Sequence, residues 1–285
     1  MKEQLVEKAT EFLEEALPYI QRFKDKIVVV KYGGKAMRSE ELKKAVITDI
    51  ALLKYFGVKP VIIHGGGPEI TKEMELAGLK PVFVNGLRVT DDATMKIVQK
   101  IFKNINAEIR ENLWQLNVAS VEINDCLISR LRDKNLGLVG EVIGVDKEKI
   151  IEAIAKDKIP VISSIGIGVC DDDNGKKTIY NINADTSAAK IAVSLNAEKF
   201  TILTDVDGVN KNGELLSHLS LSDARKYIEE GIITEGMIPK VKACIEAVEH
   251  GCKKAHLING TIFHSLLFEI FTHEGIGTEI VKNGH

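Results

Sequence analysis

Two lysines and one aspartate are the residues of this chain whose types suit chemistry on a phosphoryl group. Lys31 follows an apolar run, and Lys240 lies in the first turn of an expected helix. A lysine in a first turn opposes the helix dipole, so its position is easier to understand if an anion binds beside it. Asp185 could hold lysines in place or act through Mg2+. For Lys240 taken alone, a solvated surface charge is the alternative.

Two glycine-rich turns, each directly after an apolar run, could bind phosphate groups. Residues 27–30 lead to the turn of Gly33 and Gly34, and an equally apolar run leads to the turn of Gly66 and Gly67. Such β-branched runs are typical of strands that are buried on both faces. Glycines let the backbone approach a ligand closely, and the helix that follows directs unpaired N–H groups at an anion. The alternative is two ordinary strand-to-helix turns.

Asparagine and aspartate alternate just before an expected helix. If this segment is extended, Asn181, Asn183 and Asp185 share one face and offer amide donors beside a carboxylate. Helix capping explains one such residue but not three. Arg88, in a turn-like segment between helices, could clamp a carboxylate through two hydrogen bonds, and an exposed arginine is the alternative.

A loop that contains Thr204, Asp205 and Gly208 follows an expected strand at residues 200–203. Because α/β folds carry ligand loops at this end of a strand, the position favours a nucleotide-side loop. Its D-x-D-G spacing is typical of calcium sites, but the rest of an EF-hand loop is missing. The chain also lacks the Walker A glycine pattern, the G-x-G-x-x-G turn and the protein-kinase signatures. Phosphate chemistry here must therefore use another architecture.

Strands and helices alternate along most of the chain, and this alternation predicts the scaffold. Repeated βα units indicate an open three-layer αβα sandwich with a mainly parallel central sheet. We expect a polar hairpin at residues 171–177 and a division into two lobes near residue 175. The expected strands are residues 27–30, 61–63, 118–123, 127–130, 138–145, 159–163, 200–203, 255–258 and 277–281, and the expected helices include residues 40–56, 68–77, 92–116, 147–157, 223–230 and 237–250.

An extra amphipathic helix is expected before the first strand, over residues 2–23. Its apolar residues recur at helical spacing, with acids and lysines between them. Pro18 falls inside the pattern and should kink or end the helix. A helix at this place has no position in a βαβ scheme, so it either packs on its own fold or reaches a neighbouring subunit.

The composition of the 285 residues is ordinary for a globular protein, with 45% hydrophobic and 28% charged residues. A net charge of −3 argues against a dedicated nucleic-acid or membrane surface. No apolar run approaches the roughly 20 residues that span a bilayer, and we see no signal-peptide core. The four cysteines are scattered without zinc spacing, so we expect no metal site and a protein of the reducing cytoplasm.

Six ordered motifs together resemble the acetylglutamate kinases, a branch of the amino acid kinase family. The resemblance covers nearly the whole chain, in the order and spacing of that family, and six ordered motifs are far more specific than any one of them. The motifs are residues 31–34, 64–68, 86–91, 180–186, 204–208 and 236–241.

The resemblance implies ATP- and Mg2+-dependent phosphorylation of the γ-carboxylate of N-acetyl-L-glutamate, the second step of arginine biosynthesis. It implies that Lys31 and Lys240 neutralise the transferring phosphoryl group and that Asp185 organises both lysines. This agrees with phosphoryl transfer by positioning and electrostatics, without a base, because a γ-carboxylate is already ionised at pH 7. The implied substrate residues are Arg88 at the α-carboxylate, Asn181 at the N-acetylated end, Asn183, Gly66 and Gly67, and the implied phosphate and nucleotide residues are Gly33, Gly34, Gly66, Gly67, Thr204, Asp205, Gly208, Gly236 and Met237.

The resemblance further implies an arginine-inhibited hexamer, a trimer of dimers with interlaced N-terminal helices. It assigns residues 1–23 to oligomerisation and regulation, about 24–175 to a substrate and dimerisation lobe, and about 176–285 to a nucleotide lobe. A carboxylate such as Glu269 suits the guanidinium or ammonium of arginine, and Lys199 could meet its carboxylate; ordinary fold residues are the alternative. The implied effector residues are Tyr19, Lys199, His256, Glu269 and Gly275.

The chain departs from the family pattern mainly near the expected substrate lobe. A glycine-rich stretch is replaced by residues 121–126, a helix glycine is replaced around residues 102–104, and Ser163 and Ser164 stand where Ala-Pro is common; Glu235 is a milder change. Two alternatives stay open. One is another small-molecule kinase of the same fold, acting on aspartate, glutamate, carbamate or a nucleotide. The other is a non-catalytic arginine sensor or assembly subunit, which the retained lysines and aspartate argue against.

Overall fold

The structure of the protein is a computed structural model, and two expectations fall outside the residues that it describes. These are the lobe boundary near residue 175 and the tip of the hairpin at residues 171–177. The two strands on either side of that tip pair antiparallel, with Lys177 opposite Asp171. The described residues are 2–37, 39–171, 177–273 and 275–282.

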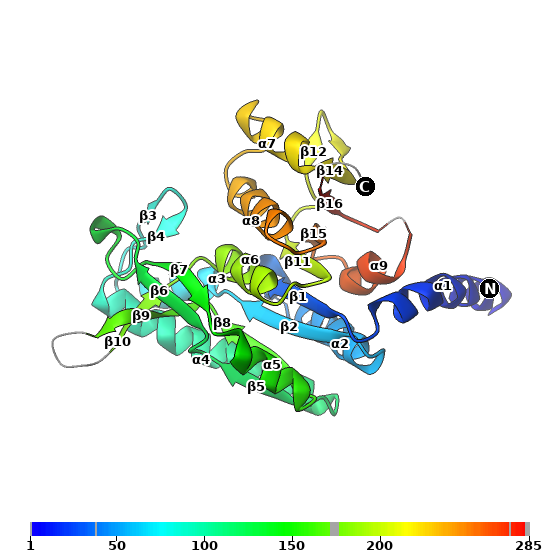
Figure 1. Ribbon diagram of the computed structural model, residues 1–285, viewed down its shortest axis with the longest axis horizontal. Coiled ribbons are helices and arrows are strands. Elements are labelled where there is room, and N and C mark those ends of the chain that lie inside the picture. Colours follow the sequence, from blue (N-terminus) through cyan, green and yellow to red (C-terminus); the bar gives the residue numbers. More distant parts are fainter. Residues whose placement is uncertain (1, 38, 172–176, 274, 283–285) are drawn as a thin grey trace.

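Eight strands form the central sheet, in the order β14-β16-β15-β11-β1-β2-β8-β5 (Figure 1). From β15 to β5 all neighbouring strands are parallel, whereas β16 runs antiparallel to β15 and pairs parallel with β14. The predicted, mainly parallel sheet is confirmed. Its strands are β14 (His218–Ser220), β16 (Thr278–Val281), β15 (Lys254–Asn259), β11 (Lys199–Thr204), β1 (Ile27–Tyr32), β2 (Lys59–His64), β8 (Ile159–Ser163) and β5 (Ser120–Ile123).

Helices cover both faces of this sheet and complete the predicted three-layer sandwich. On β1, Val28 and Val30 pack into the layer of α1, α2, α4 and α9, whereas Val29 packs into the layer of α5 to α8. Because successive strand residues point to opposite faces, a strand between two helical layers is apolar throughout. The helices are α1 (Lys2–Phe23), α2 (Glu40–Tyr55), α4 (Asp92–Gln115), α9 (Ser265–Phe271), α5 (Lys147–Ala155), α6 (Ala184–Ser194), α7 (Leu221–Glu229) and α8 (Met237–Glu249).

A smaller mixed sheet, β10-β9-β6-β7, lies beside the central sheet (Figure 1). β6 and β7 confirm the β pieces predicted near residues 127–130 and 138–145, whereas β9 was not predicted. Alternating glycines weaken the strand signal of β9, but they are needed there, since a Cβ on Gly166 would lie 2.2 Å from Oγ of Ser129. The strands are β10 (Lys177–Asn181), β9 (Ile165–Asp171), β6 (Leu127–Leu131) and β7 (Gly140–Val145).

The turn-like segment that the sequence predicts before Arg88 is the tip of a β-hairpin, and Arg88 itself lies in the second strand. β3 (Phe83–Val84) and β4 (Leu87–Arg88) pair antiparallel across Asn85 and Gly86, whose φ angles are 50° and 77°. Two consecutive positive φ angles are typical of a type I′ turn, for which Asn-Gly is the preferred sequence. The remaining elements are α3 (Gly67–Leu76), the 3-10 helices η1 (Gly34–Met37) and η2 (Lys134–Leu136), and the ribbon of β12 (Asn210–Lys211) and β13 (Glu214–Leu215).

The N-terminal helix α1 projects from the body of the molecule at its first turns and joins the core at its last turns (Figure 1). The helix predicted over residues 2–23 is confirmed, and of the two expected effects of Pro18 an end of the helix is excluded, because α1 continues to Phe23. Ala16 and Phe23, on either side of the proline, are buried, and their burial helps to offset the lost hydrogen bond. Leu13 and Leu17 are 65% and 54% exposed. None of the described helices is long and apolar enough to cross a membrane.

Candidate active site

The structure brings Lys31, Asp185 and Lys240 together in one ion-paired cluster. Nζ of Lys31 lies 3.0 Å from Oδ1 of Asp185, and Nζ of Lys240 lies 2.8 Å from Oδ2 of the same carboxylate. Asp185 and Lys31 are both buried. Because each carboxylate oxygen pairs with a different lysine, Asp185 holds the two ammonium groups side by side.

Three elements that are distant in sequence deliver these side chains. Lys31 is the second-to-last residue of β1, at the carboxyl end of the parallel sheet. Asp185 lies in the first turn of α6, whose N-terminus is capped by Asn183: Oδ1 of Asn183 accepts hydrogen bonds from the N–H groups of Asp185 and Thr186, at 2.9 and 3.1 Å. Helix α8, which packs on α6, carries Lys240 in its first turn.

Burial and mutual attraction set the charges of the cluster. Burial alone would raise the pKa of Asp185, but Lys31 and Lys240 together lower it to about 2. Burial lowers the pKa of Lys31, against the attraction of the Asp185 carboxylate. Two lysines thus share one carboxylate, so the cluster lacks one negative charge that a phosphate group can supply.

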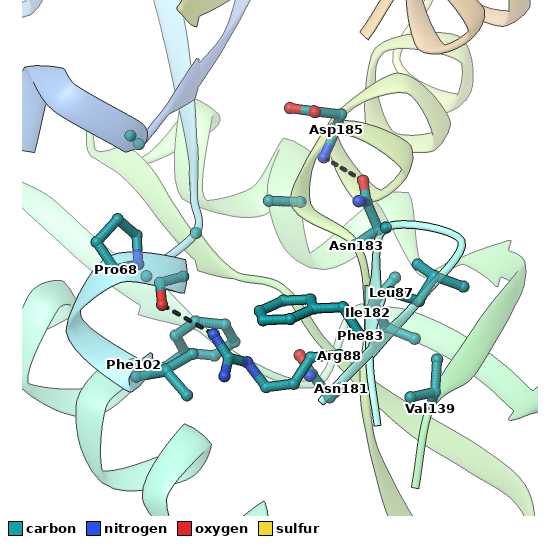
Figure 2. Close-up of a pocket in the computed structure, with 18 of the residues that line it drawn as sticks. Pro68, Phe83, Leu87, Arg88, Phe102, Val139, Asn181, Ile182, Asn183 and Asp185 are labelled. Atoms are coloured by element: carbon teal, nitrogen blue, oxygen red, sulfur yellow. Dashed lines mark hydrogen bonds between the residues drawn. The ribbon is translucent and has the colours of Figure 1, made fainter. Parts of the chain in front are cut away.

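A cavity of about 260 Å³ lies beside this cluster (Figure 2). The glycine turns after β1 and β2 line it, together with the hairpin that carries Arg88 and the end of β10. A concave site with a few convergent polar groups is typical of small-molecule binding. The predicted site residues that line it are Lys31, Gly33, Gly34, Gly66, Gly67, Arg88, Asn181, Asn183 and Asp185.

Two glycines of the turn after β2, Gly65 and Gly66, have side chains packed closely against their backbone. A Cβ on Gly66 would lie 2.8 Å from Cδ1 of Ile105 and 3.2 Å from Cε1 of Phe102. A Cβ on Gly65 would lie 3.2 Å from Cβ of Ala184. The glycines therefore allow this backbone to lie between α4, α6 and the cavity at once.

Arg88 is a buried cation whose contacts are with neutral groups. Its Nη2 donates to the carbonyl of Gly67 at 2.9 Å and to Oγ1 of Thr71 at 2.7 Å, and its Nη1 contacts Sδ of Met74 at 3.1 Å. The ring of Phe83 lies 4.7 Å from Cζ of Arg88. No ion pair of the described residues includes Arg88, and burial lowers its pKa. An anion in the cavity would supply the missing opposite charge.

The two asparagines of the cavity have different partners. Nδ2 of Asn181 donates to Oγ1 of Thr90 at 3.1 Å. The side chain of Asn183 turns toward the backbone N–H of Asp185, as Figure 2 shows, so helix capping accounts for its oxygen. Both residues line the cavity, where a ligand could reach them.

The predicted nucleotide residues other than the two glycine turns do not line this cavity, within the described part of the chain. Thr204 ends β11, the neighbour of β1 in the sheet. Gly208 has a φ of 150°, and a Cβ there would lie 2.4 Å from Oγ1 of Thr278, so close packing against β16 accounts for this glycine. The others are Asp205, next to Thr204, and Gly236 and Met237, at the start of α8.

Sequence reasoning missed the apolar part of the cavity. Phe83, Phe102, Val139 and Ile182 line it, from four separate parts of the chain. For Phe83 a signal was available, because the Asn-Gly pair at positions 85 and 86 indicates a hairpin that folds this ring back toward Arg88. For the other three, only the tertiary arrangement brings them to the site.

The five predicted effector residues line a second cavity, of about 370 Å³. Oε1 of Glu269 lies 3.1 Å from Nζ of Lys199 and pairs with Nδ1 of His256. Burial acts to raise the pKa of Glu269, but His256 and Lys199 lower it. Gly275 has a φ of 62°, and a Cβ there would lie 2.9 Å from Oε2 of Glu269. Tyr19 comes from α1, so the N-terminal helix forms part of this wall.

A family model described as "Amino acid kinase family" matches residues 26–259. The chain is 46% identical over 281 residues to the acetylglutamate kinase of Thermoanaerobacter pseudethanolicus, covering 95% of this chain and 92% of that protein. It is 47% identical over 278 residues to the acetylglutamate kinase of Prochlorococcus marinus, covering 94% and 96%. With the acetylglutamate kinase of Aquifex aeolicus it shares 42% identity over 301 residues, covering 97% and 98%.

Solved structures with the same fold include two enzymes of different chemistry. The N-acetylglutamate synthase from Neisseria gonorrhoeae, complexed with coenzyme A and N-acetyl-glutamate, has a TM-score of 0.87 at 27% identity. This match covers 97% of the present chain but only 64% of the synthase. The carbamate kinase from Giardia lamblia bound to AMP-PNP has a TM-score of 0.67 at 18% identity, covering 91% of this chain and 99% of that one, which is a likeness of fold alone.

Proposed function

We propose that this chain, which belongs to the amino acid kinase family, transfers the γ-phosphoryl group of ATP to the γ-carboxylate of N-acetyl-L-glutamate. The products are N-acetylglutamyl 5-phosphate and ADP, in the second step of arginine biosynthesis. The names of relatives that match nearly the full length support this activity. The observation that carries the proposal is the cavity between two sources of positive charge, the lysine–aspartate cluster and Arg88.

The reaction needs charge stabilisation more than proton transfer. One oxygen of the γ-carboxylate attacks the γ-phosphorus, the bond from phosphorus to the β–γ bridging oxygen breaks, and ADP leaves with that electron pair. The attacking carboxylate is ionised at neutral pH, so no base is required. Lys31 and Lys240 neutralise the oxygens of the group in transfer, and Asp185 keeps both lysines in place.

The substrate end of the cavity is built for a second carboxylate. Arg88 binds the α-carboxylate through its guanidinium, whose present partners are neutral and can be rearranged at little cost. Asn181, which also lines the cavity, binds the acetamido group. The apolar rings of Phe83 and Phe102 cover the carbon chain between these polar ends and exclude water.

The site fits a Mg2+ ion that arrives bound to the nucleotide, and not one that the protein itself holds. Among the described residues, no group of three or more His, Cys, Asp or Glu side chains could hold a metal ion, and both oxygens of Asp185 already pair with lysines. Mg2+ is commonly bound through substrate phosphates with few protein ligands. When bound, it neutralises charge on the β- and γ-phosphates.

We also propose that the chain is organised in two lobes with different roles in the reaction. Residues of about 24–175 supply the substrate side and dimer contacts, and residues of about 176–285 supply the nucleotide side through Thr204, Asp205, Gly208, Gly236 and Met237. The reaction uses ATP. Three buried cysteines are unpaired, and free thiols are typical of proteins in a reducing compartment such as the cytoplasm.

Feedback inhibition by arginine is the second part of the proposal, and the second cavity supports it. A buried carboxylate there, Glu269, suits the guanidinium or ammonium of arginine, and Lys199 and Lys254 suit its carboxylate. The wall includes Tyr19 of α1, and the exposed leucines of α1 suit contacts with another subunit in a hexamer, a trimer of dimers. Arginine would then act through a difference in affinity for two states of the assembly.

A coupled assay of ADP release tests the catalytic part. N-acetyl-L-glutamate, glutamate, aspartate and carbamate are offered in parallel with ATP and Mg2+, and we expect the highest kcat/KM for N-acetyl-L-glutamate. Faster turnover of another acceptor would assign the chain to a different kinase of the same fold. No turnover of any acceptor, with arginine binding retained in calorimetry, would favour a non-catalytic arginine sensor.

A further inference from the structure

Two peptide groups form the turn that follows β2, and three of their four polar atoms have partners within the protein. The carbonyl of His64 accepts from Oγ of Ser164 at 2.9 Å, and the N–H of Gly65 donates to the carbonyl of Tyr32 at 3.1 Å. The carbonyl of Gly65 accepts from Nδ1 of His64 at 3.1 Å. The fourth group, the N–H of Gly66, has no partner among the described residues.

His64 is a neutral donor in this turn. Its side chain is completely buried, and burial lowers its pKa to about 4. A carbonyl oxygen can only accept, so the single ring proton lies on Nδ1 and is donated to Gly65. The second ring nitrogen, Nε2, must then act as an acceptor.

Asn106 of α4 supplies the donor that this tautomer needs. Its Nδ2 lies 3.0 Å from the carbonyl oxygen of Val161 and 3.4 Å from Nε2 of His64. An amide group has two hydrogens and can serve both acceptors. The opposite amide orientation would set its oxygen against the Val161 carbonyl, so the orientation of Asn106 and the tautomer of His64 are fixed together.

Because the peptide group is planar, the hydrogen bond that fixes the Gly65 carbonyl also fixes the direction of the Gly66 N–H. The C=O and N–H of a trans peptide point in opposite directions. Nδ1 of His64 holds the Gly65 carbonyl toward the core, which leaves the N–H of Gly66 on the side of the cavity that Gly66 lines. Because neither glycine has a Cβ, rotation of this peptide is otherwise easy.

We propose that His64, oriented by Asn106, is a positioning residue for phosphoryl transfer. It fixes the Gly65–Gly66 peptide so that the N–H of Gly66 donates to an oxygen that gains negative charge in the reaction, the geometry that stabilises a transition state. The inference deepens the proposed function and rests on it for the identity of that oxygen. His64 touches neither substrate, and its effect passes entirely through the backbone.

Two substitutions at position 64 separate positioning from packing. The side-chain nitrogen of asparagine can occupy the place of Nδ1, whereas that of glutamine reaches the place of Nε2. We expect His64→Asn to retain kcat within about three-fold and His64→Gln to lower kcat roughly 10- to 100-fold, somewhat less than the 10²–10³ typical of deleting a donor. The KM values for N-acetyl-L-glutamate and ATP should stay within about three-fold in both variants, because ground-state binding is kept.

Ser163→Ala provides the matched control. Oγ of Ser163 lies 3.3 Å from Nε2 of His64, but it donates to Oδ1 of Asn124 at 2.8 Å and touches no atom of the turn. We expect this variant to retain wild-type kcat. If His64→Gln does not fold, His64→Ala replaces it, and added imidazole should restore its kcat by refilling the site.

Crystal structures of the His64 variants without substrate test the positioning role of His64 independently of the proposed substrate. We expect the Gly65 carbonyl to keep its direction in His64→Asn and to rotate in His64→Gln. Unchanged peptides in both variants, or equal kcat losses in both, would overturn the positioning role even if the wild-type protein phosphorylates N-acetyl-L-glutamate. A rotated peptide in a protein that ignores this acceptor would instead refute the proposed substrate and leave the positioning role standing.

Discussion

At the scale of single residues, the shared carboxylate of Asp185 makes two cations act as one unit. We predict that Lys31→Ala and Lys240→Ala each lower kcat roughly 10²–10³-fold, the usual effect of losing one charge-stabilising donor. Steady-state ADP release measures the effect, and thermal unfolding checks that the fold persists. Lys242→Ala, an exposed lysine on the same helix as Lys240, is the control. Near-normal turnover of either variant would show that the replaced lysine does not stabilise the phosphoryl group in transfer.

Arg88 belongs to the same scale but acts on binding. We predict that Arg88→Ala raises the KM for N-acetyl-L-glutamate roughly 10- to 100-fold, since a hydrogen bond to a charged group contributes about 1.5–3 kcal/mol. Arg88→Lys should restore little, because lysine lacks the planar pair of donors. Arg130→Ala, which removes an exposed arginine paired with Glu141, is the control. If the KM for ATP rose more than the KM for N-acetyl-L-glutamate, Arg88 would belong to the nucleotide side of the site and not to the substrate side.

At the scale of elements, a buried carboxylate connects α2 with the start of α9. Asp49 of α2 is completely buried, and its Oδ1 lies 2.6 Å from Nδ1 of His264, directly before α9. Burial raises the pKa of Asp49 to about 6, although His264 and the N–H groups of Leu266 and Leu267 favour its charged form. Since α9 carries Glu269, this contact fixes the helix that forms one wall of the second cavity.

This raised pKa predicts a pH-dependent contribution to stability. In the unfolded chain the pKa of an aspartate is near 3.9, so the folded state binds its proton more tightly. The contribution of Asp49 is therefore fully present below about pH 4 and is lost as the pH rises through about 6. We predict that Asp49→Asn gains free energy of unfolding relative to wild type on going from pH 4.5 to 7.5, by roughly 2–3 kcal/mol at most.

Urea unfolding at the two pH values measures this difference. Asp157→Asn, an exposed aspartate in a surface ion pair with Lys54, is the control and should show little pH dependence. A difference between Asp49→Asn and wild type that stays constant with pH would show that the fold does not raise the pKa of Asp49. A difference that falls as the pH rises would show that the charged form of Asp49 stabilises the fold.

At the scale of the whole molecule, α1 can act both as part of the chain's own core and as a contact with other subunits. Its last turns are packed in the core through Ala16 and Phe23, and Phe12 meets the ring of Phe268 on α9 at 5.6 Å. Leu13 and Leu17 face outward. The same helix thus contacts α9 and the second cavity on one side and offers an apolar surface on the other.

We predict that deletion of residues 1–22 reduces a hexamer to dimers and weakens inhibition by arginine, while kinase activity persists because the lysine–aspartate cluster lies outside α1. Light scattering gives the mass of the assembly, and ADP release with increasing arginine gives the inhibition. Glu269→Gln in the full-length chain is the companion variant, which should weaken inhibition without dissociating the assembly. A truncated protein that stays hexameric, or a full-length enzyme that ignores millimolar arginine, would contradict this prediction.

Local patterns of the amino-acid sequence by themselves determine much of this protein. The apolar run at residues 27–30 predicts a strand buried on both faces, and β1 is such a strand, because a period of two leaves no polar position when both faces are covered. Helix starts follow from capping residues: Asp91 caps α4 through Oδ1, which accepts from the N–H of Thr94 at 2.7 Å. Four of the six motifs supply residues that line one cavity, and a fifth supplies Lys240, which pairs with Asp185, although the sequence does not show how they meet.

Only the tertiary structure decides how those residues are arranged, because the deciding contacts join segments far apart in the chain. The sequence does not reveal that Phe102 of α4 reaches the cavity or that the side chain of Asn106, also on α4, lies against His64. The continuation of α1 through Pro18 likewise depends on the tertiary structure, because burial of Ala16 and Phe23 in the core outweighs the tendency of proline to end a helix. Local preferences contribute tenths of a kcal/mol to about 3 kcal/mol per residue, and packing in a core can exceed them.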